Sequence, residues 1–457
     1  MIRLFRVFIP TTVVGLLLSE AVLVFAAYLT PAFFLVEDPG LFLLYENGLL
    51  RIGIVVGSIL FGLYLNDLYT QLQVRSRILL VQQICLVLGV AFLVQAFFGY
   101  LDAPLRMPRW SMMAGSALCL LGLPAWRILY NNLVFKVMGG ERILFLGDSP
   151  VLRQIASQIA EQPELGWRSL GFVTDQIGPS EDTLGPPDRL KSIVASTAPS
   201  RIVVGFADRR RRLPVYDLLD ISLTGTLIEE AGITYETAFG RVCLSELRPG
   251  DLVFSNRFTP RRRHVIVQSL YCAIVGFVGV VLTLPLMALV AIAVKLTSSG
   301  PALFRQTRVG LNGKLFTLYK FRSMRVDAEA VSGAVWAIEN DPRITPLGRW
   351  LRLLRLDELP QLFNVLKGEM AIVGPRPERP EFVKILNEQI PFYIQRHRVK
   401  PGITGWAQIN YRYGNTVEDT ATKLEYDLYY VKNLSMALDF FVMFHTVKTM
   451  LLQRGAY

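Results

Sequence analysis

The chain has 457 residues, of which 52% are hydrophobic, and its formal net charge is +11. This length is sufficient for several domains, and the gathering of apolar residues into long runs indicates a membrane protein. A positive charge suits anionic lipid, phosphate-rich substrates or nucleic acid; the apolar runs favour the first two, so no nucleic-acid partner is expected. The four cysteines have no paired spacing and indicate neither a disulfide framework nor a zinc site.

The first 138 residues are predicted to form a four-helix transmembrane bundle. Four apolar runs, each close to or above the roughly 20 residues that span a bilayer, lie at about 7–29, 41–65, 78–100 and 110–135. Basic residues precede the first run, separate the second from the third and follow the fourth: Arg3, Arg6, Arg75, Arg77, Lys136 and Arg142. The positive-inside rule therefore places both ends of the bundle in the cytoplasm, although Arg106 and Arg109 oppose this assignment. No run carries a series of charges, so a transport pathway has little support.

Residues 139–260 are predicted to form a Rossmann-like α/β domain, which makes the whole chain a membrane α plus α/β protein. Segments typical of buried strands alternate with polar segments; they are ERILFL, SLGFV and RIVVGF, which begin at Glu141, Ser169 and Arg201. The turn after the first strand holds a single glycine, Gly147, whereas a dinucleotide fingerprint needs three. This degenerate nucleotide-binding fold therefore favours a structural, dimerising or sensing role over cofactor binding.

A second membrane element follows at about 265–294. Arg261–Arg263 precede it and Lys295 follows it, so both of its flanks prefer the cytoplasm. Leu284 and Pro285 lie inside it, and proline removes a helical hydrogen bond and bends the helix. One interpretation is a proline-kinked transmembrane helix. The two basic flanks favour another, a re-entrant helix that enters one leaflet, bends at this point and returns.

The stretch from Arg343 to Glu378 contains two candidate catalytic acids, Asp357 and Glu358. Read as a helix, its first part has an apolar stripe, a basic face and an interfacial anchor: Leu347, Leu351 and Leu354, then Arg349, Arg352 and Arg355, and Trp350. The acids follow where this helix should end, because Pro360 restricts the residue before it and suits the first turn of a new helix. An aspartate at such a junction can equally be an N-cap, and the pair alone does not decide between these roles.

The segment GPRPE, at Gly374–Glu378, adds a guanidinium on a stiff turn. Arginine grips phosphate oxygens in a bidentate manner, so Arg376 is a candidate phosphate-binding residue. Acidic residues for a divalent cation and arginines for phosphate are the components of phosphoryl-transfer sites. The stretch therefore indicates phosphoryl transfer close to lipid.

Four motifs occur in a fixed order: KFRSM from Lys320, LDELPQLFNVLKGEM from Leu356, GPRPE from Gly374 and KPGITGWAQIN from Lys400. Together they resemble the bacterial sugar transferases that act as monotopic phosphoglycosyl transferases. The resemblance covers about 261–457, the predicted catalytic domain, and the upstream architecture is similar to the large polyprenyl-phosphate hexose-1-phosphate transferases. The segments LRPGDLVFSNRF, from Leu247, and NTVEDTATKLEYDLYYVKN, from Asn415, are most similar to the exosortase (PEP-CTERM)-associated branch.

The resemblance implies a reaction and its participants. A sugar 1-phosphate would pass from a nucleotide diphosphate sugar, by default a UDP-hexose, to polyprenyl (undecaprenyl) phosphate, as the first membrane step of exopolysaccharide or other glycan assembly. Asp357 would be the nucleophile that forms a covalent phosphosugar intermediate, and Glu358 would help to hold a Mg²⁺ cofactor. The phosphate-binding candidates are Arg352 and Arg376, with Lys320 and Arg322 as weaker ones.

The resemblance also implies a location, the bacterial inner membrane, with the α/β and catalytic domains on the cytoplasmic side; a homodimer is expected. The C-terminal segment 424–452 is apolar but interrupted by Asp439, His445 and Lys448, which favours interfacial amphipathic helices over another span. Two alternatives stay open. One is a membrane-anchored NAD-dependent enzyme that modifies nucleotide sugars, which the single glycine disfavours. The other is an inactive membrane scaffold or sensor, which the joint presence of the site residues disfavours.

Overall fold

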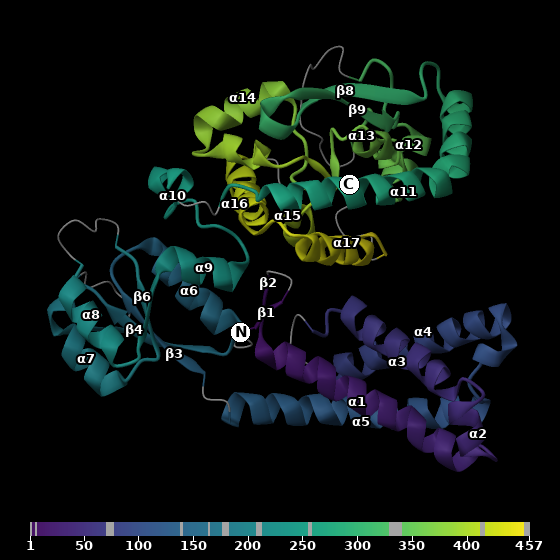
Figure 1. Ribbon diagram of the computed structural model, residues 1–457, viewed down its shortest axis with the longest axis horizontal. Coiled ribbons are helices and arrows are strands. Elements are labelled where there is room, and N and C mark those ends of the chain that lie inside the picture. The colour runs from purple at the N-terminus through teal and green to yellow at the C-terminus, as the bar shows by residue number, and fades with distance from the viewer. Residues whose placement is uncertain are drawn as a thin grey trace. The chain divides into compact units, whose positions relative to one another are not determined.

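The chain folds as two compact units, which are described separately (Figure 1). The computed structural model describes residues 2–4, 7–69, 77–137, 140–162, 165–175, 182–206, 213–254, 258–328, 341–411 and 416–451. The first unit consists mainly of Phe8–Glu230 and the second mainly of Ala231–Tyr457.

Four long apolar helices account for most of residues 11–137. They are α1 (Thr11–Leu35), α3 (Gly48–Leu65), α4 (Arg77–Leu101) and α5 (Arg109–Val137), and all four are long and apolar enough to cross a membrane. Side chains with no exposed surface, such as Ile52, Ile84 and Leu123, form a common hydrophobic core, whereas many other apolar side chains of these helices are exposed. An apolar exterior around an apolar core is the pattern expected of helices in lipid.

The first predicted span began too early. Residues Val7–Ile9 form the strand β2 beside β1 (Ile2–Leu4), and α1 begins only after Pro10, which occupies the N-cap position. Two short elements, α2 (Pro39–Leu44) and η1 (Ala103–Leu105), lie between the long helices.

One ion pair is buried among these helices. Nε of Arg127, on α5, lies 2.6 Å from Oε1 of Glu20, on α1, and the two side chains are 4% and 0% exposed. Arg127 also donates a hydrogen bond to the Leu68 carbonyl, and the Tyr69 hydroxyl donates to Glu20. The sequence did not reveal this pair, because each member is a single charge in a separate apolar run. A charge at membrane depth is costly unless it is paired, so the contact fixes α1 against α5.

The rest of the first unit is built on a parallel five-stranded sheet. Its strands are β3 (Glu141–Leu146), β4 (Trp167–Val173), β5 (Thr183–Gly185), β6 (Arg201–Val204) and β7 (Leu227–Glu230), in the order β5-β4-β3-β6-β7. The helices are α6 (Pro150–Glu161), η3 (Pro187–Arg189), α7 (Leu190–Thr197) and α8 (Val215–Leu223). Four successive residues of β3, Ile143–Leu146, are fully buried, which a strand covered on both faces requires. The sheet confirms the predicted α/β class, and its order matches the first five strands of the Rossmann order, 3-2-1-4-5.

The second unit packs around α11 (Arg262–Thr297), a 36-residue apolar helix. In its first half, Cys272 shares a core cluster with Phe316, and in its second half, Val294 shares another with Leu351. The ribbon of α11 changes direction before it reaches β8 (Figure 1). Both halves of the helix therefore contact other parts of the second unit.

The outward side of α11 is apolar and uncovered. Leu270, Phe277, Leu282 and Leu296 are each more than half exposed, and the helix is long and apolar enough to cross a membrane. The predicted bend residue Pro285 lies inside the helix, between its two packed halves. This surface is suited to contact with lipid.

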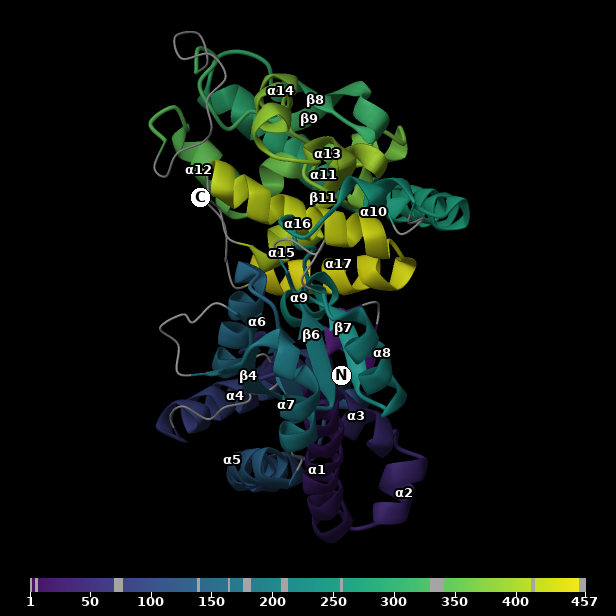
Figure 2. The ribbon, with the colours of Figure 1, turned by 90° about the vertical axis from the view of Figure 1, so that its left-hand side faces the viewer.

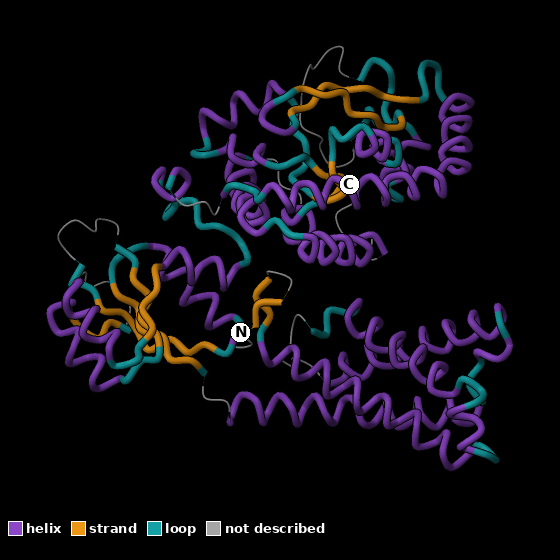
Figure 3. Tube along the Cα trace, in the orientation of Figure 1, coloured by secondary structure: helices purple, strands orange, loops and turns teal. Residues whose placement is uncertain are grey.

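The rest of the second unit consists of strands and helices that are shorter than α11. Strands β8 (Leu303–Val309) and β9 (Leu315–Phe321) form an antiparallel hairpin, and β10 (Ala371–Val373) pairs in parallel with β11 (Gly402–Thr404) (Figure 3). The helical elements are α9 (Ala231–Phe239), α10 (Pro249–Val253), η5 (Leu311–Gly313), α12 (Pro346–Leu353), η6 (Leu356–Glu358), α13 (Gln361–Leu366), α14 (Pro380–Gln389), η7 (Tyr393–Arg398), α15 (Trp406–Asn410), α16 (Val417–Asn433) and α17 (Met436–Leu451). The last two, α16 and α17, follow one another as yellow helices in Figure 2.

The division between the units lies after Glu230, earlier in the chain than the predicted domain boundary at residue 260. Helix α9 and the residues after it pack on later parts of the second unit. The Tyr235 hydroxyl donates a hydrogen bond to Glu425 at 3.1 Å, and Nε1 of Trp406 donates to the Gly240 carbonyl at 2.8 Å. Sequence composition does not reveal this association, because it depends on contacts with distant residues.

Candidate functional site

The two adjacent acids lie at a junction between helices, as predicted. Thr345 caps α12 by accepting a hydrogen bond from the Gly348 amide at 3.0 Å. After α12, Arg355 adopts a left-handed conformation, with φ of 57°, and turns the chain into η6, which carries Asp357 and Glu358. Both acids are buried because η6 packs against β9.

The apolar stripe of α12 is divided between two surfaces. Leu351 is 4% exposed and, with Leu347, packs in one cluster with residues of α11 and β9. Trp350 and Leu354 are 64% and 50% exposed. The interpretation of the whole stripe as a lipid-facing surface was therefore wrong for Leu347 and Leu351, because an apolar helix close by covers them.

Glu358 is held by two cations. Its Oε1 accepts hydrogen bonds from Nζ of Lys320 and from Nη2 of Arg376, both at 2.9 Å. Three predicted site residues from separate motifs thus meet at one oxygen atom. Burial favours a higher pKa for Glu358, but the positive charges of Lys320, Arg376 and Arg355 outweigh it and hold the pKa well below its usual range. Glu358 is therefore an anion at neutral pH.

Asp357 has a different environment. It is 6% exposed, and its carboxylate accepts no hydrogen bond from any residue that the structure describes. Burial raises the pKa of Asp357; the charge of Lys320 opposes the increase and that of Glu358 adds to it, with a net rise. Arg352 and Arg376 are also close enough to oppose the rise. A carboxylate without hydrogen-bond donors on its oxygens, and with three cations nearby, is available to attack an electrophile.

The two remaining cations of the predicted site have other partners. Nε of Arg352 donates to Oγ of Ser323 at 3.0 Å, and its terminal nitrogens have no partner in the described part of the chain. Arg322 is buried, and its Nη2 donates to the carbonyl and the hydroxyl of Ser298, the C-cap residue of α11, at 2.9 and 2.7 Å. A guanidinium in this position stabilises the end of a helix. Arg352 thus lies beside the acids, whereas Arg322 contacts the end of α11.

The GPRPE turn packs against the KPGITGW segment through two glycines. The Gly402 amide donates to the Pro375 carbonyl at 3.0 Å. A Cβ atom on Gly374 would lie 2.3 Å from the Lys400 carbonyl oxygen, and a Cβ on Gly402 would lie 2.1 Å from the Gly374 nitrogen. Only glycine lets two backbones approach this closely, so the two motifs form one structure that carries Arg376 to the acids.

The acids fit the predicted Mg²⁺. No group of three or more His, Cys, Asp or Glu side chains suited to a metal ion occurs among the described residues. In phosphoryl-transfer sites, however, Mg²⁺ is commonly held by one or two carboxylates and takes its other ligands from substrate phosphates and water. Oε2 of Glu358 and both carboxylate oxygens of Asp357 accept no hydrogen bond from the residues described. The pair is therefore suited to a Mg²⁺ ion that arrives with phosphate.

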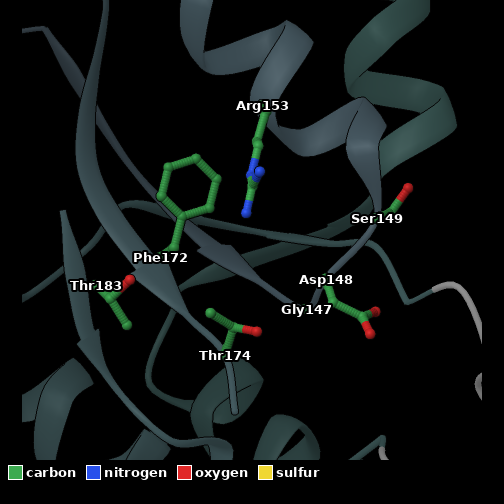
Figure 4. Close-up of a pocket in the computed structure, with 7 residues that line it drawn as sticks. All are labelled: Gly147, Asp148, Ser149, Arg153, Phe172, Thr174 and Thr183. Carbon is green, nitrogen blue, oxygen red and sulfur yellow. The ribbon is translucent and has the colours of Figure 1, made fainter. Parts of the chain in front are cut away.

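The α/β sheet has a pocket of its own at the carboxyl ends of β3 and β4, an edge at which such folds bind ligands. The pocket is lined by Gly147, Asp148, Ser149, Arg153, Phe172, Thr174 and Thr183. Figure 4 shows Arg153 pointing towards Phe172 and Thr174. Gly147 has a φ of 122°, and a Cβ there would lie 1.9 Å from the Gly205 carbonyl oxygen. This glycine therefore serves the packing of two strand ends.

Sequence reasoning missed two residues that support the site. Ser323 orients Arg352, as described above. Asn364 is fully buried and joins α13 to β9, since it donates to the Thr317 carbonyl at 2.7 Å and accepts from the Tyr319 amide at 3.1 Å. Signals for both were present: Ser323 lies within KFRSM, and Asn364 is the one polar residue of the apolar run LFNVL.

Residues 263–453 match the family model described as bacterial sugar transferase. Over 345 residues the chain is 42% identical to a UDP-glucose:undecaprenyl-phosphate glucose-1-phosphate transferase from Klebsiella pneumoniae. The aligned region covers 72% of this chain and 70% of the relative. Over 244 residues the chain is 40% identical to a UDP-N-acetylgalactosamine-undecaprenyl-phosphate N-acetylgalactosaminephosphotransferase from Aeromonas hydrophila. The aligned region covers 53% of this chain and 54% of the relative.

A third relative is shorter. An exopolysaccharide production protein from Rhizobium leguminosarum bv. phaseoli is 45% identical over 168 residues, which are 36% of this chain and 84% of the relative. The chain spans about half the length of the Aeromonas protein. The family match includes α11, both acids and the GPRPE turn. From these motifs, their geometry and these matches, the chain belongs to the bacterial sugar transferase family.

Proposed function

We propose that the protein transfers a sugar 1-phosphate from a nucleotide diphosphate sugar, most simply a UDP-hexose, to polyprenyl (undecaprenyl) phosphate. The transfer is the first membrane step in building an exopolysaccharide or another glycan on a lipid carrier. The observation that carries the proposal is the contrast between the acids: Asp357 is buried beside cations and accepts no hydrogen bond from the residues that the structure describes, while Glu358 is fixed by Lys320 and Arg376. The names of the Klebsiella and Aeromonas relatives support the same substrates.

The reaction proceeds by two displacements at one phosphorus atom. A carboxylate oxygen of Asp357 attacks the phosphorus that carries the sugar, the bond to the bridging oxygen breaks, and its electron pair leaves with the nucleoside monophosphate. An oxygen of the polyprenyl phosphate then attacks the same phosphorus, the bond to Asp357 breaks, and the carboxylate is regenerated. Two steps let a water-soluble donor and a lipid acceptor use one site in turn.

The cations of the site bind the phosphate groups of both substrates. The terminal nitrogens of Arg352 have no partner among the residues described and are suited to this purpose, Arg376 and Lys320 both contact Oε1 of Glu358, and Arg322 supports the group from the end of α11. Mg²⁺ held by Glu358 would neutralise phosphate charge and polarise the phosphoryl oxygens. Glu358 keeps its negative charge for this role because its pKa is held low.

We place α11 in the membrane as a re-entrant helix. Both of its halves pack on one catalytic unit, Pro285 lies between them, and both flanks are basic. The catalytic unit and the α/β sheet then lie on the cytoplasmic side of the bacterial inner membrane. The homodimer and the placement in the exosortase-associated branch stay predictions.

The proposal is tested by looking for the covalent intermediate. The purified protein, in nanodiscs with Mg²⁺, is incubated with nucleotide sugars labelled in the sugar, one donor at a time and without a lipid acceptor. We expect label on the protein with one donor and its release as lipid product when polyprenyl phosphate is added. Asp357→Asn should take up no label, whereas Glu381→Gln, which removes an exposed carboxylate of the same unit, should label as the wild type does.

Two outcomes would contradict the proposal at different levels. Lipid product without any labelled protein would favour direct transfer between bound donor and acceptor, and Asp357 would then be a metal ligand instead of a nucleophile. Neither label nor lipid product with any donor would contradict the reaction itself.

A further inference from the structure

The backbone of the GPRPE turn is fixed through its carbonyl oxygens. Four successive carbonyls accept hydrogen bonds from different elements: Pro375 from the Gly402 amide at 3.0 Å, Arg376 from Nη2 of Arg396 at 3.0 Å, Pro377 from Nη1 of Arg308 at 2.9 Å, and Glu378 from the Val309 amide at 3.0 Å. Satisfied carbonyls hold each peptide plane in one orientation. The guanidinium of Arg376 can then reach Glu358 from a turn that does not shift.

Arg396, on η7, is a buried donor to this turn. It is 6% exposed, and besides the Arg376 carbonyl its guanidinium contacts Oδ2 of Asp427 at 2.8 Å and the Tyr393 hydroxyl at 2.6 Å. Asp427, on α16, is 2% exposed, and burial raises the pKa of Asp427 to about 6 although Arg396 opposes the change. A buried ion pair recovers little more than the free energy of its own desolvation, so its presence is weak evidence for a role in stability alone.

A second buried group meets the chain just before the turn. The Tyr430 hydroxyl, also on α16, lies 3.0 Å from the Val373 carbonyl and 2.6 Å from Oδ1 of Asp439, on α17. Gln268, on α11, donates to Oδ2 of Asp439 at 2.9 Å, and the Tyr271 hydroxyl donates to the same oxygen. Tyr430 is therefore held in place by its own buried partners, as Arg396 is.

We propose that α16 positions the phosphate-binding guanidinium of Arg376 by holding the backbone that carries it at two points. Arg396, paired with Asp427 of α16, contacts the Arg376 carbonyl, and Tyr430 of α16 contacts the Val373 carbonyl before the turn. Asp427 and Tyr430 lie three residues apart on α16 and hence on one face of it, so a single helix sets both anchor points. Arg396 and Tyr430 are positioning residues, since they act through the backbone that carries Arg376. This inference rests on the proposed function, in which Arg376 binds phosphate.

Lys432 provides a matched control on the same helix. Its Nζ forms an ion pair with Glu236 at 2.6 Å, and both side chains are 15% exposed. This pair ties α16 to α9, and no contact described for Lys432 reaches the GPRPE turn. Loss of the pair weakens the attachment of α16 at a place from which Arg376 should not be affected.

The test uses the full chain in nanodiscs and the variants Arg396→Lys, Tyr430→Phe and Lys432→Met. Two quantities are measured: kcat/KM for the nucleotide sugar, and hydrogen–deuterium exchange of peptides that cover residues 371–379. In Arg396→Lys and Tyr430→Phe we expect faster exchange in these peptides and a fall in kcat/KM of about 10- to 100-fold, the size of effect that a small misplacement of a substrate-binding group produces. Lys432→Met should keep wild-type values of both quantities.

Wild-type exchange and wild-type kcat/KM in Arg396→Lys and Tyr430→Phe would overturn the inference. Equal losses in Lys432→Met would also overturn it, since any weakening of α16 would then have the same effect. Should Arg396→Lys fail to fold, Tyr430→Phe decides the matter, because it removes a single oxygen atom. An inactive wild type would contradict the proposed function, while the exchange measurement would still report on the positioning of the turn.

Discussion

Asp357 and Glu358 are consecutive residues with opposite electrostatic surroundings. Burial acts on both, but among the described residues cations contact the carboxylate of Glu358 and not that of Asp357, so the pKa of Glu358 falls while that of Asp357 rises. Glu358 is therefore an anion that orders Lys320 and Arg376, and the carboxylate oxygens of Asp357 accept no hydrogen bond from the described part of the chain. The separation of roles arises from the position of two long cationic side chains.

Catalysis should fail on the acid side at a higher pH than the usual pKa of an aspartate. Asp357 must be ionised to attack, and because its pKa is raised, protons reach it while Glu358 is still ionised. Lys320 lowers the pKa of Asp357, so Lys320→Met should move the acid limb of the kcat/KM profile to higher pH, and Glu381→Gln should leave it in place. An acid limb that stays or moves to lower pH in Lys320→Met would contradict this account.

Removal of the metal ion should stop the reaction reversibly. A chelator should abolish sugar transfer, because without Mg²⁺ the phosphates of the donor lack a counter-charge. Addition of Mg²⁺ should restore the transfer. Glu358→Gln should raise the Mg²⁺ concentration for half-maximal rate by about 10- to 100-fold, the loss that changes around a metal site typically cause. The measurement is a Mg²⁺ titration of initial rates. The same half-maximal Mg²⁺ concentration in Glu358→Gln and wild type would exclude this residue as a ligand.

Among the elements, α1 and α5 share a buried ion pair between Glu20 and Arg127, in addition to neutral hydrogen bonds such as that from Trp126 to Ser19. Glu20→Ala leaves Arg127 buried without its counter-charge, and the loss of one partner of a buried pair typically costs about 3–5 kcal/mol of unfolding free energy. The double variant Glu20→Leu with Arg127→Met should recover most of this loss, since apolar residues can replace a buried pair at little cost. Denaturant titration in mixed micelles measures both, and a double variant no more stable than Glu20→Ala would contradict the explanation.

Elements with strong periodicity could be predicted from the sequence, but their partners could not. Hydropathy identified α11 and the four long helices α1, α3, α4 and α5, and apolar segments identified β3, β4 and β6. The side of α12 that faces α11 could not be deduced, since an apolar stripe is the same whether lipid or protein covers it. The pair of Glu20 and Arg127 was missed for a related reason: two isolated charges give no sign that they meet across 107 positions.

The residues of the candidate site could be predicted from the sequence, but most of the contacts between them could not. The pattern of the stretch from Arg343 to Glu378 supplied the acids and Arg376, the family resemblance supplied their roles, and the structure joins Arg376 to Glu358 at one carboxylate oxygen. The contacts that position the turn could not be predicted, because Arg396 and Tyr430 act on backbone carbonyls, which every sequence has. Recognition of such contacts requires the fold.

Within the whole molecule, the second unit holds all the residues of the candidate site. Its cores, both acids and all the described contacts of the site lie within Ala231–Tyr457. The Rhizobium relative matches 168 residues of this chain over 84% of its own length, and the family model matches residues 263–453. We therefore expect residues 231–457, expressed alone in membranes, to retain sugar-phosphate transfer, as measured by lipid-linked product per mole of protein. Insertion into the membrane without transfer would show that the first unit contributes to catalysis.

The proposed re-entrant arrangement of α11, in which both halves pack on one unit, has a consequence for how the proposed acceptor is met. A site held beside the leaflet in this way would encounter its lipid by diffusion in the plane of the membrane, and its nucleotide sugar by diffusion in water. The effective concentration of the acceptor is then a surface density. Dilution of the vesicles should leave the rate per enzyme unchanged at saturating donor, whereas dilution of polyprenyl phosphate with other lipids should lower it.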